Sequence, residues 1–333
     1  KKVSNDRVVC HLLHLREEGA GMNIAVLGAG SLGSAIGGTL ALAGNEVTLI
    51  GRTAHVEAIN ASGLTLIAPE GEQQARVQAF TSAEGLEPAE LVIVLCKAFD
   101  TEECIETNRS IIGPGSVVLT LQNGLGNEDL LGKLLDPKQV IAGKTYIGGM
   151  MLAPGKVQST TEGKQTFIGE YSGPVTPRIE AIAQVFNDAG MECTASPRMK
   201  NIIWDKLLIN VATGAVCGIS RLPYGELYQH PELYATAIAA VKEGMRVAIA
   251  EGIILSRHDP QEVLELAREN LPFDFKPSIL QSLEKHRRTE IDVINGAVVT
   301  YGKRHEIETP VNETLVAGIK GIERYIDITD PSH

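Results

Sequence analysis

The feature that most constrains the fold of this chain is a glycine-rich sextet, GAGSLG, at residues 28–33. It directly follows an apolar run, NIAVL, and opens an apolar helical pattern. Glycine at its first position allows a tight turn, at the third it lets a pyrophosphate approach the backbone, and at the sixth it lets helix and strand pack closely. In this context the motif predicts a dinucleotide-binding βαβ unit, and a purely structural glycine turn is the alternative. The residues predicted to contact the dinucleotide here are Gly28, Ala29, Gly30, Ser31, Leu32 and Gly33.

Short apolar runs alternate with helix-like segments over residues 22–199, which is typical of a parallel sheet covered by helices on both faces. The expected strands are NIAVLG, EVTLIG, LVIVLC, SVVLTLQ and QVIAG. The expected helices are SLGSAIGGTLALAG, HVEAINASG, TEECIETNRSII, NEDLLGKLL and, further along, PRIEAIAQVFNDAG. Two more segments, KTYIGGMMLAPGKVQSTT and KQTFIGEY, predict strands that extend this sheet in an antiparallel direction.

From about Pro197 onward long helical periodicities replace the alternation, among them IIWDKLLINVATGAV and the pattern SILQSLEKHRRTEIDVINGAVVTYGKRH. The predicted fold class is α/β, with an N-terminal Rossmann-type dinucleotide-binding domain at residues 22–197 and an all-helical C-terminal domain at residues 198–327. Residues 1–21 are interpreted as a leader or disordered extension, and the final DITDPSH as a frayed tail.

Composition narrows the classes of function. A formal net charge of −11 argues against nucleic-acid and anionic membrane partners, which need clustered Lys and Arg. The stretch Met22–Asn45 carries no charge, but its six glycines favour a strand, a turn and a close-packed helix over a membrane span. Five cysteines without CxxC spacing argue against a disulfide framework and indicate a reducing cytoplasm. Cys10, His11 and His14 lie close together, but no fourth ligand is apparent and no metal is predicted.

Polar residues follow three of the expected strands, at the sheet edge where such folds bind ligands. The second strand ends in LIGRT, so Arg52 stands where NAD-binding folds usually have an acidic residue. An arginine can pair with a 2′-phosphate through a charge-assisted fork, which predicts NADP(H) as the cofactor, with a surface arginine as the alternative. Lys97 and Asn123 follow two later strands at the same edge and are predicted to bind the cofactor. The alternatives are a solvated strand end for Lys97 and a left-handed Asn-Gly turn for Asn123.

The helical half has its own polar candidates. Lys206 and Asn210 are four residues apart in WDKLLINVA and therefore share one helix face. Solvation alone does not explain a lysine inside so apolar a helix. Glu290 is predicted in another helix, where its carboxylate could orient an ammonium group, although periodicity alone favours the solvent face.

Five motifs in this order resemble the ketopantoate reductase (2-dehydropantoate 2-reductase) family, over residues 22–325. They are GxGxxG, the strand-end lysine, QNGLG, WDKLLIN, and RRTEIDVING with ETPVNETL behind it. The resemblance implies NADPH-dependent reduction of 2-dehydropantoate to (R)-pantoate, in the pathway to coenzyme A, in a cleft between the two domains. It implies that Lys206 is the catalytic lysine and Glu290 its partner, and that Asn123 contacts the cofactor. The substrate contacts that it implies are Asn123, Lys206, Asn210 and Ser278.

Two details depart from the family pattern. Relatives acting on ketopantoate typically have a second asparagine after Asn210, where this chain has Gly214, which offers no side-chain amide. Ser278 and Glu290 are twelve residues apart, which is ~18 Å along a straight helix, so the chain must bend if both serve one small substrate.

The alternatives to ketopantoate reduction follow from these details. One is a paralogous dehydrogenase for another branched or aromatic 2-oxo or 2-hydroxy acid. Another is a non-catalytic NADP-binding redox sensor, which would have no reason to keep the lysine, asparagine and glutamate together. The expected partner is a small-molecule 2-oxo acid, without nucleic acid or membrane, and a homodimer is the default assembly.

Overall fold

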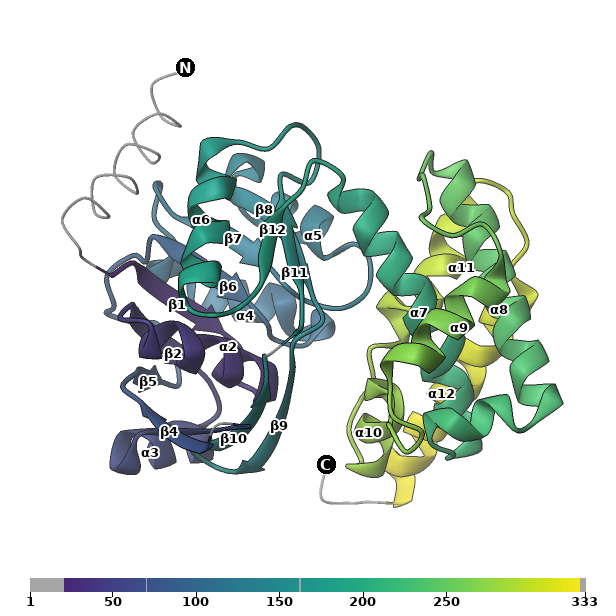
Figure 1. Ribbon diagram of the computed structural model, residues 1–333, viewed down its shortest axis with the longest axis horizontal. Helices are drawn as coiled ribbons and strands as arrows, with labels where there is room; N and C mark the ends of the chain where they lie inside the picture. Colours follow the sequence, from purple (N-terminus) through teal and green to yellow (C-terminus); the bar gives the residue numbers. More distant parts are fainter. Residues whose placement is uncertain (1–20, 70, 162, 330–333) are drawn as a thin grey trace. The chain divides into compact units, whose positions relative to one another are not determined.

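The computed structural model describes residues 21–329 except 70 and 162, and divides into two compact units (Figure 1). Unit 1 comprises the described residues up to Gln122 together with Asn127–Met199. Unit 2 comprises the short segment Asn123–Gly126 and the described residues from Lys200 onward. In Figure 1 the part coloured purple to teal carries the strands, and the part coloured green to yellow consists of helices.

Unit 1 is built on an eight-stranded sheet with the order β12-β11-β8-β7-β6-β1-β2-β5. The six strands from β8 to β5 are parallel, β11 pairs antiparallel with β8, and β12 pairs parallel with β11. The bounds are β1 (Asn23–Leu27), β2 (Glu46–Ile50), β5 (Gln78–Phe80), β6 (Leu91–Val94), β7 (Val117–Thr120), β8 (Val140–Thr145), β11 (Thr166–Gly169) and β12 (Cys193–Ala195). The near-continuous burial of β1, β6, β7 and β8 matches a sheet that is covered on both faces.

The strand order places a topological switch at β1. After β1 the chain pairs β2 on one side, and it later returns to pair β6 on the other side. Connections that run in opposite directions from a central strand leave a crevice at its carboxyl end, where open α/β sheets bind their ligands. The glycine-rich turn follows β1 at this position.

A second, four-stranded sheet corrects one sequence expectation. Its order is β4-β3-β10-β9, with bounds β3 (Leu64–Ala68), β4 (Gly71–Ala75), β9 (Gly148–Ala153) and β10 (Lys156–Thr160). The segment KQTFIGEY does extend the main sheet, as β11, but the β9–β10 hairpin was wrongly assigned to that sheet. Its partner is β3, which pairs parallel with β10 and lies about ninety residues earlier. Strands β3, β4 and β5 were not predicted from the sequence; β4, the exposed and polar run GEQQA, gives little strand signal.

The helices of unit 1 are α2 (Ser31–Leu42), α3 (Thr53–Ser62), α4 (Thr101–Thr107), α5 (Asn127–Leu134) and α6 (Pro177–Asp188). Glycines let α2 lie close against the strands. A Cβ at Gly37 would be 2.7 Å from Leu49 Cδ2, and one at Gly38 would be 2.8 Å from Leu66 Cδ1. The uncharged stretch that contains α2 is therefore a strand, a turn and a close-packed helix, as its glycines predicted.

Unit 2 consists of helices in the part of the chain that the structure describes. Their bounds are α7 (Met199–Ser220), α8 (Pro231–Ala250), α9 (Pro260–Asn270), α10 (Ser278–Glu284), α11 (Asn295–Arg304) and α12 (Pro310–Thr329). By length and composition α7 could cross a membrane, but 67% of its most apolar window is buried inside the fold, as expected of a core helix. Residues 327–329, expected in a frayed tail, form the last turn of α12.

The pattern interpreted as one helix from Ser278 to His305 is broken in the structure. Helix α10 ends at Glu284, His286 adopts a left-handed φ of 51°, and a short 3₁₀ turn, η5 (Ile291–Val293), precedes α11. The chain therefore bends between Ser278 and Glu290, and the 18 Å separation of a straight helix does not apply.

Candidate functional site

The turn after β1 is shaped by glycines that leave no room for side chains. Gly28 has a left-handed φ of 101°, and a Cβ there would be 2.3 Å from the backbone nitrogen of Cys96 on the neighbouring strand end. A Cβ at Gly33 would be 2.3 Å from the carbonyl oxygen of Gly28. Gly30 differs, because no atom lies within 4 Å of its Cβ position. The space at Gly30 is therefore open on the side where a pyrophosphate would approach the backbone.

Ser31 is the first residue of α2, and its hydroxyl is held by the second sheet. The backbone N–H of Met151 on β9 donates to Ser31 Oγ at 3.1 Å. Since the hydroxyl accepts this bond, its own proton can be donated to another oxygen. A Cβ at Gly149 of the same strand would be only 2.6 Å from the carbonyl oxygen of Ser31. Strand β9 thus fixes the start of α2 at close range.

The end of β2 carries the predicted selector of the cofactor. Gly51 N–H donates to the carbonyl of Phe80 at 3.0 Å, which continues the pairing of β2 with β5 by one residue. Arg52 follows, with an exposed side chain, as the residue that caps α3. Arg52 itself is thus at a helix N-terminus, where the helix dipole favours an anion.

The ends of β6 and β7 are clamped together by Gln122. Its Nε2 donates to the carbonyl of Cys96 at 2.9 Å and to Thr101 Oγ1 at 2.8 Å, while its Oε1 accepts from Thr120 Oγ1 at 3.1 Å. Gln122 thereby fixes the backbone immediately before Lys97, which is half-buried. A structural clamp of this kind holds both strand-end candidates, because Asn123 directly follows Gln122.

Lys144 was not predicted from the sequence. It lies near the end of β8, its side chain is 2% exposed, and its Nζ donates to the carbonyl of Gln122. The signal that could have revealed it is a lysine next to the buried run VIAG. Glu128 on α5 is also buried, and burial raises the pKa of its carboxyl while the charge of Lys144 partly opposes that rise.

In unit 2, Lys206 and Asn210 lie one turn apart on α7, and both are half-buried. Glu290 was predicted to lie in a helix. In the structure it directly precedes η5, and only 6% of it is exposed. The interpretation of Glu290 as a solvent-face residue is therefore wrong. Asn295 Nδ2 donates to the carbonyl of Val211 at 3.4 Å, which ties the segment after Glu290 to α7.

The segment that carries Asn123 also contacts this region of unit 2. Leu125 N–H donates to the carbonyl of Val293 at 2.9 Å, and a Cβ at Gly124 would be 2.4 Å from the same oxygen. Gly124 has a left-handed φ of 86°, so glycine is required both by its conformation and by this close approach. The structure thus brings the Asn123 turn onto η5, the 3₁₀ turn that Glu290 precedes.

Helix α10 packs along the same stripe of α7 that carries Lys206 and Asn210. Gly214 follows Asn210 at a spacing of four, and a Cβ on it would be 3.0 Å from Ile279 Cδ1. Ser278, which is exposed, is the first residue of α10 and precedes Ile279. The space beside Gly214 is therefore occupied by Ile279.

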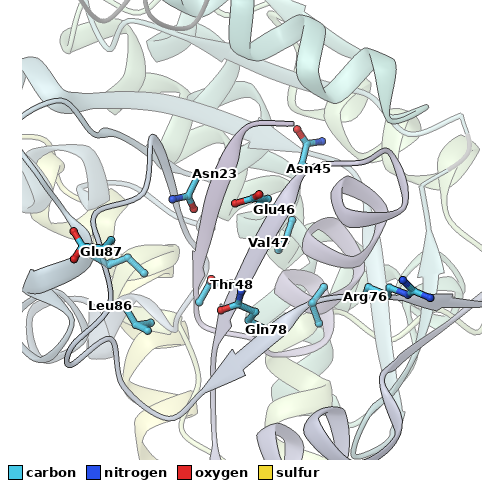
Figure 2. A pocket seen from close by; sticks show the side chains of 11 residues that line it. Asn23, Asn45, Glu46, Val47, Thr48, Arg76, Gln78, Leu86 and Glu87 are labelled. Carbon is cyan, nitrogen blue, oxygen red and sulfur yellow. The ribbon is translucent and has the colours of Figure 1, made fainter. Parts of the chain in front are cut away.

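A hollow of about 500 Å³ opens at the amino ends of the strands of the main sheet, opposite the carboxyl ends where the glycine-rich turn lies (Figure 2). Its walls come from the amino ends of β1, β2 and β5, including Asn23, Glu46 and Gln78, and from Arg76. Ligands of doubly wound sheets bind at the carboxyl ends of the strands, so this hollow is not the predicted dinucleotide site. Within the described ranges no cluster of three His, Cys, Asp or Glu could hold a metal ion, and Cys10, His11 and His14 lie outside those ranges.

Comparison with known proteins decides the family. The model of ketopantoate reductase PanE/ApbA matches residues 24–173, and the model of its C-terminal part matches residues 198–323. The chain belongs to the ketopantoate reductase family. It is 37% identical over 306 residues to the 2-dehydropantoate 2-reductase of Pyrococcus abyssi, which covers 91% of this chain and 98% of the relative. The corresponding protein of Archaeoglobus fulgidus is 33% identical over 301 residues, covering 90% and 97%.

Solved structures agree with the fold. A PanE/ApbA family ketopantoate reductase from Ralstonia eutropha superposes with a TM-score of 0.84 at 32% identity, covering 92% of this chain and all of the other. D-mandelate dehydrogenase, solved as a ternary complex with NADH and anilino(oxo)acetate, superposes with a TM-score of 0.86 at 27% identity, with the same coverage. The predicted fold class is confirmed. Family membership makes the chain an oxidoreductase that acts on a CH–OH group of a small molecule with a nicotinamide dinucleotide.

The two glycines of the turn after β1 give a matched pair of variants. Gly30→Ala is expected to fold with little change in thermal stability, because its Cβ meets open space, but to raise the Kd of the dinucleotide by about tenfold or more through contact with the pyrophosphate. Gly33→Ala is expected to lower the melting temperature, because its Cβ would be 2.3 Å from a backbone oxygen that cannot move alone. Thermal unfolding and dinucleotide titration of both variants check this. Equal melting temperatures for the two, or normal dinucleotide binding by Gly30→Ala, would contradict it.

Proposed function

We propose that this chain reduces 2-dehydropantoate to (R)-pantoate with NADPH, as a step in coenzyme A biosynthesis. The observation that carries the proposal is similarity over nearly the whole chain, at 33 to 37% identity, to four archaeal proteins named 2-dehydropantoate 2-reductase. The dehydrogenase alternative for an aromatic acid has a structural neighbour in D-mandelate dehydrogenase, but at a lower identity of 27%. The redox sensor alternative does not fit a family of enzymes.

The dinucleotide site is assigned to residues 22–197. The open backbone at Gly30, the hydroxyl of Ser31 and the N-terminus of α2 form a cradle that a pyrophosphate fits and that a Cβ would fill. Arg52, at the N-terminus of α3, supports the choice of NADP(H) over NAD(H), because its exposed guanidinium suits a 2′-phosphate. Lys97 and Asn123 follow the clamped strand ends and are assigned to the same cofactor.

The substrate and catalytic residues are assigned to residues 198–327, together with Asn123. When bound, NADPH supplies the hydride that attacks the C2 carbonyl of the substrate. Lys206 stabilises the negative charge that develops on the carbonyl oxygen and donates a proton to that oxygen. Glu290 favours the charged form of Lys206, and Asn210 and Ser278 bind the substrate.

The cysteines and the reaction class indicate the cellular setting and the partner. The four cysteines that the structure describes are free thiols, in keeping with a reducing cytoplasm. The substrate is a small-molecule 2-oxo acid, and a homodimer is the assembly that we propose.

Lys206→Ala tests the catalytic assignment. It is expected to lower kcat by about 10² or more, the scale of losing a general acid, while the protein stays folded and binds NADPH. Lys242→Ala, which removes an exposed lysine on α8, is the matched control and should leave kcat unchanged. Steady-state kinetics with 2-dehydropantoate and thermal unfolding measure both. A kcat within a few-fold of the parent, or an unfolded Lys206→Ala protein, would make the lysine structural.

Arg52→Ala tests the choice of cofactor. It is expected to weaken NADPH by about 1 to 3 kcal/mol and to leave NADH nearly unchanged, because only NADPH carries the 2′-phosphate. Arg76→Ala, at the hollow on the other edge of the sheet, removes an exposed arginine from the same unit and should change neither affinity. Fluorescence titration of each dinucleotide gives the Kd values. Equal affinity of the parent for both dinucleotides would refute the preference for NADPH.

A further inference from the structure

His55 is a buried histidine that the proposed reaction does not use. It lies in the first turn of α3, three residues after Arg52, and 7% of it is exposed. Its ring reaches Ser34 on α2 on one side and Gly155, in the turn between β9 and β10, on the other. Three elements of unit 1 therefore meet at one imidazole.

The hydrogen bonds fix the protonation of the ring. The backbone N–H of Gly155 donates to His55 Nδ1 at 2.9 Å. An amide N–H cannot accept, so Nδ1 carries no proton, and the proton of the neutral ring lies on Nε2. Nε2 is 2.9 Å from Ser34 Oγ and therefore donates to that hydroxyl. Burial lowers the pKa of His55, which also favours the neutral ring.

Each side of this bridge leads by one further bond to a turn of the dinucleotide site. Ser34 N–H donates to the carbonyl of Gly30 at 2.9 Å, which closes the first turn of α2. His55 N–H donates to the carbonyl of Arg52 at 3.0 Å, which closes the first turn of α3. The bond between His55 and Ser34 thus links the backbone of the glycine turn to the backbone that carries Arg52.

The hairpin of β9 and β10 contacts the first turns of both α2 and α3. Through Gly155 it holds the ring of His55, and through Met151 it holds the hydroxyl of Ser31. The turn of this hairpin also lies close to α3, because a Cβ at Gly155 would be 3.2 Å from Ala58 Cβ. The second sheet therefore braces the pyrophosphate end and the 2′-phosphate end of the site together.

We propose that His55 is a positioning residue for the dinucleotide, which holds the turn of Arg52 at a fixed place relative to the turn of Gly30. NADPH joins its pyrophosphate to its 2′-phosphate through one ribose, so both groups can be bound at once only if the two turns keep a set separation. His55 itself does not touch the cofactor in this scheme and acts through Ser34 and Arg52. The inference rests on the proposed dinucleotide site and adds the residue that keeps its two ends in register.

The test uses His55→Ala and Ser34→Ala, which remove the same hydrogen bond from its two sides. Each is expected to raise the Kd of NADPH, measured by fluorescence titration, by about tenfold or more, and the Kd of NADH by a smaller factor, because NADH lacks the group bound by Arg52. The KM for NADPH should rise in step, while kcat at saturating NADPH stays within about threefold of the parent, since the reacting groups are untouched. If His55→Ala does not fold, Ser34→Ala decides the question alone.

Asn60→Ala is the matched control. Asn60 is an exposed residue on the same helix whose side chain donates to the carbonyl of Ala79 at 3.0 Å, so the variant also loses one bond of α3, away from Arg52. It should leave the Kd of NADPH within about twofold of the parent. An unchanged Kd of NADPH in Ser34→Ala, or an equal rise in Asn60→Ala, would overturn the proposal. Equal binding of NADPH and NADH by the parent would instead refute the 2′-phosphate site, and His55 would still be judged by the rise in Kd of either dinucleotide.

Discussion

A close contact between backbones constrains the corner where β1 leads into α2. Gly28 lies against the backbone of Cys96, and Gly33 lies against the carbonyl of Gly28, each at a distance that excludes even one methyl group. This approach places the N-terminus of α2 at the carboxyl edge of the sheet, at the strand where the order reverses. The other residues that we propose for the dinucleotide site follow neighbouring strands in the sequence: Arg52 follows β2, Lys97 follows β6, and Asn123 follows β7.

In unit 2, glycines likewise allow close packing, here against α7. Lys206, Asn210, Gly214 and Gly218 follow one another at a spacing of four, so polar groups and close packing share one stripe of the helix. The two glycines admit α10, since Cβ atoms there would be 3.0 Å and 2.9 Å from the side chain of Ile279. Ile279 therefore occupies the space beside both glycines, and α10 packs closely against this stripe of α7.

Much of the fold could be predicted from the sequence, because the decisive signals are local. The glycine sextet, the buried strands and the apolar helices each reveal themselves within a few residues. The partner of the β9–β10 hairpin could not be predicted, since strand pairing is set by residues about ninety positions away. The burial of Glu290 was missed because the periodicity assumed a continuous helix, whereas the chain turns at His286 and re-enters a helix only at Asn295. The hydrogen bonds of His55 and Lys144 likewise join residues that lie far apart in the sequence.

The proposed function of this chain is the reduction of 2-dehydropantoate. It is tested most directly by initial rates of NADPH oxidation by the purified protein, with 2-dehydropantoate and with phenylglyoxylate, the 2-oxo acid that corresponds to mandelate. We expect saturable oxidation with 2-dehydropantoate, with kcat/KM higher than for phenylglyoxylate by about tenfold or more, a difference of about 1.4 kcal/mol in transition-state binding. No oxidation with 2-dehydropantoate, or a preference for phenylglyoxylate, would contradict it.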